Sequence, residues 1–138
     1  MVQLYSKVTD MNKDNDISND DVSEYNNYNL NKCLEEYYDD VFKQIDEVAE
    51  HILMLNYEPL ATMKDYLQNA TLVEAQNKKV KEEEIFSVVM NDYIQLMKEA
   101  KDIKTQADEK QVVETSAFID NYISDFNKKI WMIRQMMA

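Results

Sequence analysis

Apolar residues recur along most of the chain at the three- and four-residue spacing of amphipathic helices. The clearest apolar stripe runs from about Leu30 to Leu55 and includes Ile45 and Ile52, which are expected to point inward. Two more stripes run from about residue 82 to 107 and from about Val112 to Met137. Residues 2–11 carry a shorter stripe. This pattern predicts an all-α fold of four amphipathic helices, in which the first helix is shortened.

Polar segments separate the stripes. Residues 12–29 are rich in Asn, Asp and Ser, whose side chains compete with a helix for backbone hydrogen bonds, so this segment is predicted to be a polar loop. Asn56 is placed to end the second helix in a left-handed conformation. Pro59 then restarts the chain, and residues 60–68 predict a short helix in the crossover between the second and third helices. Residues 1–138 are expected to form a single domain.

The composition supports a helical fold. The chain contains no glycine and one proline. Tight hairpin turns need positive φ angles, which only Asn and Asp could then supply. Strands joined by hairpins are therefore disfavoured, whereas abundant Leu, Met, Lys, Glu and Gln favour helices.

The net charge and the cysteine content limit the expected binding partners and the expected cellular compartment of the protein. The net charge is −12, from 27 acidic and 15 basic residues, and such a surface repels phosphate backbones but concentrates cations. DNA is therefore not the expected partner. No apolar run approaches the roughly 18 residues of a membrane span. Cys33 is the only cysteine, which fits a reducing cytoplasm.

Acidic and amide side chains recur at four-residue spacing on the predicted second helix. Asn31 precedes Glu35 by four residues, and Asp46 precedes Glu50 by four. Such pairs lie on one face of a helix, and their oxygens suit iron, manganese, magnesium or calcium. Acidic pairs on an amphipathic helix are more often solvated surface than metal ligands. The spacing alone therefore does not establish a metal site.

Three blocks of the sequence resemble the Dps family (DNA-binding protein from starved cells), which are miniature ferritins. The blocks are "LEEYYDDVFKQIDEVAEHIL", "PLATMKDYLQNATLVEA" and "NKKIWMIRQMM", and their order and separation also match. The resemblance implies a ferritin-like four-helix bundle with a short crossover helix. It also implies a shell of twelve subunits, built from two-fold dimers, that oxidises ferrous iron, stores ferric iron and limits oxidative stress.

The resemblance also implies a metal site between two subunits. Asp46 and Glu50 match the D-x-x-x-E motif that one subunit supplies. The neighbouring subunit would supply two histidines and an acid. The second histidine position falls on Asn31 and the acid on Glu35, so this chain departs from the family at the histidine.

The first family histidine is also replaced. It belongs to a pattern resembling L-Y-x-K-x-x-x-x-H-W, which reads "LYSKVTDMNK" here and places Asn12 at the histidine. An ungapped count would place it at Asn19 instead. Asn12 is preferred because the "LYSK" match then implies an insertion in the polar loop. Both imidazoles are absent under either alignment.

Loss of both imidazoles changes the expected chemistry. Amide oxygens are weaker iron ligands than imidazole nitrogens, so ferroxidase activity is expected to be weakened and enzymatic function stays open. Three carboxylates and two amides suit Mg²⁺, Ca²⁺, Mn²⁺ or loosely held Fe²⁺. One alternative is a non-catalytic shell or partner-binding bundle derived from the same fold. A DNA-protecting function is least supported, because the chain lacks the family's lysine-rich N-terminal tail.

Acidic residues near the predicted turn between the last two helices could line a pore for iron, as the resemblance to the family implies. The family places acids at three-fold pores to admit iron, and Ala117 replaces the expected Asp there. Asp108, Glu109 and Glu114 lie nearby in the sequence and could compensate.

Three other side chains are interpreted structurally. His51, the only histidine, occupies a position where the family often has Arg, and it is expected to be exposed or to pack. Trp131 is expected in the core or at an interface. Cys33 is expected to be a buried small residue.

Overall fold

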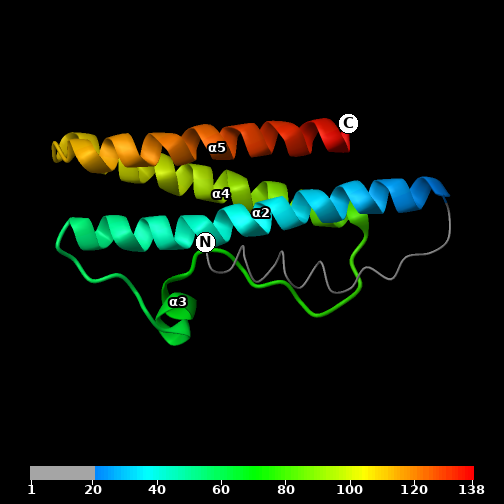
Figure 1. Cartoon of the computed structure of the whole chain (residues 1–138), viewed down its shortest axis with the longest axis horizontal. Helices are drawn as coiled ribbons and strands as arrows, with labels where there is room; N and C mark the ends of the chain where they lie inside the picture. Colours follow the sequence, from blue (N-terminus) through cyan, green and yellow to red (C-terminus); the bar gives the residue numbers. More distant parts are fainter. Residues whose placement is uncertain (1–20) are drawn as a thin grey trace. The chain divides into compact units, whose positions relative to one another are not determined.

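The computed structural model describes residues 21–138, and their side chains from Leu30 onward. Every regular element in this part of the chain is a helix: α2 Asp21–Met54, α3 Met63–Asn69, α4 Glu82–Glu109 and α5 Val113–Met137 (Figure 1). The all-α prediction is confirmed for these residues. The short helix predicted at residues 2–11 lies outside them. No helix in residues 21–138 is long and apolar enough to cross a membrane.

Two predicted boundaries are corrected. The loop predicted for residues 12–29 is wrong from Asp21 onward, because α2 begins there; residues 12–20 lie outside the described part. Extending a nucleated helix adds one hydrogen bond per residue, which outweighs the small propensity cost of Asn and Ser. The crossover helix α3 begins at Met63 rather than at residue 60, because Thr62 is its N-cap and accepts a hydrogen bond from the Asp65 N–H at 3.2 Å.

The chain divides into two compact units, with the boundary between Glu82 and Glu83. The first contains α2 and α3, and the second contains α4 and α5. The single domain expected over residues 1–138 stays a prediction.

The end of α2 confirms the predicted cap. Asn56 has a φ of 63°, in the left-handed region. Its N–H donates to the carbonyl oxygen of Leu53 at 2.9 Å, and the Tyr57 N–H donates to the carbonyl oxygen of Ile52 at 3.1 Å. These two bonds define a Schellman motif, built here on Asn instead of the usual glycine.

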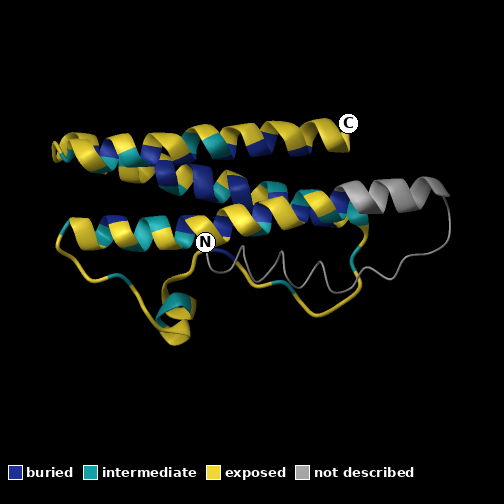
Figure 2. Ribbon diagram, in the orientation of Figure 1, coloured by how far each residue is buried: buried dark blue, intermediate teal, exposed yellow. Residues whose placement is uncertain are grey.

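Helices α4 and α5 form an antiparallel hairpin (Figure 1). A second Schellman motif ends α4: Gln111 has a φ of 58°, and the Val112 N–H donates to the carbonyl oxygen of Ala107 at 2.8 Å. Tyr93 of α4 and Phe126 of α5 pack with ring centroids 5.7 Å apart. Buried positions recur every three or four residues along both helices (Figure 2).

The buried stripe of α2 is rotated relative to the predicted one. Gln44 and His51 are buried, whereas Ile45 and Ile52, which were predicted to point inward, are half-buried. The prediction was wrong at these positions because α2 has apolar residues on two adjoining faces. Ile45 and Ile52 line a pocket that also involves α3.

Candidate metal centre

The second half of α2 presents the two predicted ligands Asp46 and Glu50 to solvent. They lie one turn apart on a continuous helix, and both side chains are exposed. Among the described residues neither makes an ion pair, whereas the neighbouring Glu47 pairs with Lys43 at 3.6 Å. Two carboxylates four residues apart on a helix repel each other. A cation would relieve this repulsion.

The other predicted ligands on α2 lie farther toward its N-terminus. Asn31 is half-buried and Glu35 is exposed, again one turn apart. Fifteen residues separate Asn31 from Asp46, which is about 22 Å along a helix. The two pairs therefore cannot hold the same ion within one chain. Each pair is at most half of a site.

No complete metal site is found within the described part of one chain. From Leu30 onward, where side chains are described, no group of three or more His, Cys, Asp or Glu could hold a metal ion. Asn12, the remaining predicted ligand, and its alternative Asn19 lie outside the described residues. A site that combines Asn31 and Glu35 with Asp46 and Glu50 would require a second chain, because the two pairs lie about 22 Å apart on α2.

The remaining side chains singled out from the sequence are placed as follows. His51 follows Glu50 but is buried, which agrees with packing rather than exposure. Cys33 is only half-buried, so the buried position expected for it is corrected. Trp131 is 57% exposed, which excludes the core and leaves the interface prediction.

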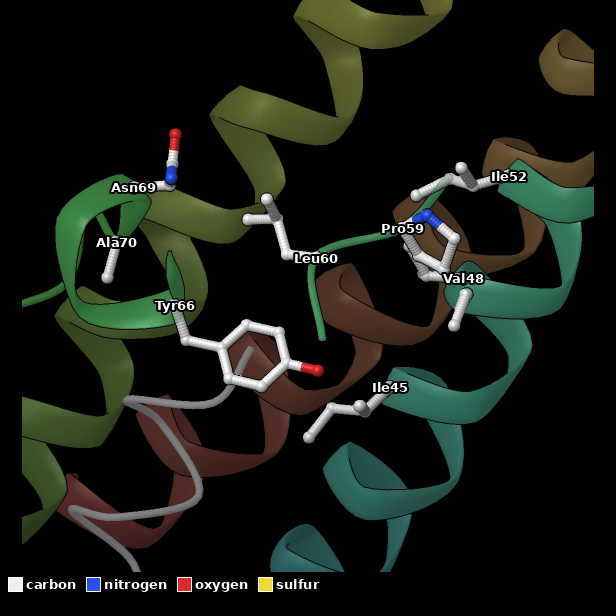
Figure 3. A pocket seen from close by; sticks show the side chains of 9 residues that line it. Ile45, Val48, Ile52, Pro59, Leu60, Tyr66, Asn69 and Ala70 are labelled. Atoms are coloured by element: carbon white, nitrogen blue, oxygen red, sulfur yellow. The ribbon is translucent and has the colours of Figure 1, made fainter. Parts of the chain in front are cut away.

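A pocket of about 220 Å³ lies beside the second half of α2 (Figure 3). It is lined by Ile45, Val48, Ala49, Ile52, Pro59, Leu60, Tyr66, Asn69 and Ala70. Tyr66 extends from α3 toward α2 (Figure 3). None of the lining side chains is a carboxylate, so this pocket is not a site for a cation.

A polar network at the α4–α5 turn was not predicted from the sequence. Lys104 contacts Asp108, Ser116 and Asp120, and the hydroxyl of Ser116 also bonds Asp108. The four-residue spacing of Lys104 and Asp108 was a signal for one of these contacts. The contacts with Ser116 and Asp120 depend on the pairing of the two helices, which the spacing does not reveal.

The chain is similar to known proteins in both sequence and structure. A family model described as Ferritin-like domain matches residues 21–138. The DNA protection during starvation protein of Brevibacillus brevis is 30% identical over 112 residues, covering 81% of this chain and 74% of that protein. The protein of the same name from Helicobacter pylori is 27% identical over 111 residues, covering 80% of this chain and 77% of that protein.

A solved structure gives the same result for the fold. The crystal structure of a Dps protein from Bacillus brevis matches with a TM-score of 0.87 and 27% sequence identity. The match covers 99% of this chain and 87% of that chain. The ferritin-like four-helix bundle expected from the sequence is thereby confirmed.

Proposed function

This chain belongs to the ferritin-like family and, within it, to the Dps proteins, and from this premise we propose that it binds ferrous iron and stores it as ferric iron in a cytoplasmic homo-oligomeric shell. The observation that carries the proposal is the pair Asp46 and Glu50, exposed one turn apart on α2. Two carboxylates at this spacing offer hard oxygen ligands to a divalent cation. Iron is the cargo of this site.

The proposed site is completed by a second copy of the chain. The two pairs are placed symmetrically about the midpoint between Asp40 and Val41. Asn31 lies as far before this midpoint as Glu50 lies after it, and the same holds for Glu35 and Asp46. Two α2 helices that cross antiparallel at this midpoint would therefore bring both pairs opposite each other. One two-fold axis would generate two equivalent sites, each with ligands from both protomers.

The asparagines set the expected chemistry of this site. An amide oxygen from Asn31, and one from Asn12, would replace imidazole nitrogens. Fe²⁺ would then be held more weakly, and its oxidation by oxygen or peroxide would be slower. Mn²⁺ and Mg²⁺, which prefer oxygen ligands, would compete for the same position.

Ferrous titration under anaerobic conditions, followed by addition of air or peroxide, tests the proposal. The variant Asp46→Asn with Glu50→Gln is expected to lose at least about tenfold in ferrous affinity and to lose the ferric absorbance. The control Glu83→Gln with Asp102→Asn removes two exposed carboxylates from α4 and should behave like the unmodified protein. Oxidation no faster than in buffer alone would refute storage and favour a non-catalytic shell.

Light scattering tests the shell separately. Twelve chains of 16.4 kDa would give about 200 kDa. A monomer would lack the second half of every proposed site, and the two-chain arrangement would then be rejected.

A further inference from the structure

The Lys104 network, defined as Lys104, Asp108, Ser116 and Asp120, lies at the turn end of the α4–α5 hairpin. The Lys104 ammonium donates to the Ser116 hydroxyl oxygen at 2.8 Å and lies 3.0 Å from Asp120 Oδ1. A third oxygen, Asp108 Oδ2, lies 3.9 Å away. The Ser116 hydroxyl donates its own proton to Asp108 Oδ1 at 2.5 Å, so its lone pairs remain available to Lys104.

The network has the ligand chemistry of a cation site. Two carboxylates and a hydroxyl are the hard oxygen ligands that Mg²⁺, Mn²⁺ and Ca²⁺ take in proteins. The Lys104 ammonium is a compact positive charge at the place where these oxygens converge. A divalent cation could not bind the same oxygens without displacing it, because the two positive charges would repel each other.

The position on α4 favours a positive charge. Asp108 and Glu109 are the last two residues of the helix, and its last turn contains no basic residue. Carboxylates are unfavourable at the negative end of a helix dipole. Lys104, one turn earlier, offsets this charge, and its side chain is only 32% exposed, compared with 55% for Asp108 and 56% for Asp120.

We propose that Lys104 is a built-in cation that occupies the oxygen-lined site formed by Asp108, Ser116 and Asp120, and that it keeps divalent metal ions off this end of the hairpin. Lys104 is then a selectivity-determining residue. Because Lys104 excludes metal ions here, cargo cations would bind to Asp46 and Glu50 of α2 instead; this consequence rests on the proposed function.

Manganese binding tests the proposal in chains that also carry Asp46→Asn and Glu50→Gln, so that the α2 carboxylates do not contribute. In this background the Lys104→Met variant is expected to bind one additional Mn²⁺ per chain. Its affinity should be at least about tenfold higher than that of any Mn²⁺ binding with Lys104 in place. The EPR signal of free Mn²⁺ measures how much is bound. Lys101→Met removes the same charge from an exposed position one turn earlier on α4 and is expected to gain none. Adding Asp120→Asn to Lys104→Met should abolish the gained site.

Two further variants keep the test decisive if Lys104→Met does not fold. Lys104→Gln removes the charge but keeps a hydrogen-bond donor, and it should also gain the site; circular dichroism reports whether each variant remains helical. Asp120→Asn in a chain that retains Lys104 should leave the Mn²⁺ count unchanged. Equal counts for folded Lys104 and Lys101 variants would overturn the proposal, as would a count that falls when Asp120 is changed beside an intact Lys104. Both comparisons are independent of whether Asp46 and Glu50 bind iron.

Discussion

At the scale of single residues, two described positions with left-handed backbone are occupied by residues other than glycine. Gln111 and Asn56 have φ angles of 58° and 63°, and each ends a long helix. A side chain with a Cβ atom pays about 1–2 kcal/mol in this conformation, and Asn pays less than most because its short amide can bond locally. Gln has no such compensation. The cost should therefore be larger at Gln111 than at Asn56.

Gln111→Gly is accordingly expected to raise the free energy of unfolding by about 0.5–1 kcal/mol. Asn56→Gly should raise it less. Urea denaturation followed by circular dichroism measures both changes. As a control, Gln106→Gly replaces an exposed residue within α4 and should lower the free energy of unfolding by about 1 kcal/mol. A loss of stability at Gln111 would contradict the assignment of its conformation.

The absent imidazoles give a second prediction at this scale. Asn31→His combined with Asn12→His is expected to speed iron oxidation by at least about tenfold, because two nitrogen ligands would replace weaker amide oxygens. Ferric absorbance after addition of peroxide measures the rate. Asn31→His combined with Asn19→His serves as the matched control for the alignment. No gain in an assembled Asn31/Asn12 double variant would show that the alignment or the site is wrong.

At the scale of helices, apolar periodicity predicted more than local polarity did. The pattern located α4 and α5 to within two residues, because both helices bury a regular stripe. The polarity of residues 21–29 concealed the first turns of α2, since helix propagation overrides weak local preferences. The exposure of Asp46 and Glu50 was predictable from helical spacing. The contacts of Lys104 were not, because they join residues from two helices.

Burial on α5 gives a test at the same scale. Ile133 is fully buried, whereas the neighbouring Met132 is 38% exposed. Ile133→Ala is expected to lower the free energy of unfolding by about 2–5 kcal/mol through lost burial and a cavity, and Met132→Ala by clearly less. Urea denaturation distinguishes the two. Equal losses would mean that α5 is rotated about its axis relative to this structure.

At the scale of the whole molecule, net charge decides between partners. The relatives carry names that refer to DNA protection, but this chain has a net charge of −12. Repulsion from phosphate is strongest at low salt, so no retardation of DNA is expected in a mobility shift at low ionic strength. A shift that disappears as salt is added would contradict this prediction and would reveal a local basic surface.

The central claim is that a cation is bound between α2 carboxylates of one protomer and Asn31 and Glu35 of another. Crystals of the assembled protein, grown without oxygen and soaked with ferrous salt, test it most directly through the anomalous scattering of iron. The expected result is an iron peak within bonding distance of Asp46 and Glu50, with Glu35 of a second protomer facing it. Asp46 and Glu50 without iron and open to solvent, with no second chain opposite them, would contradict the claim.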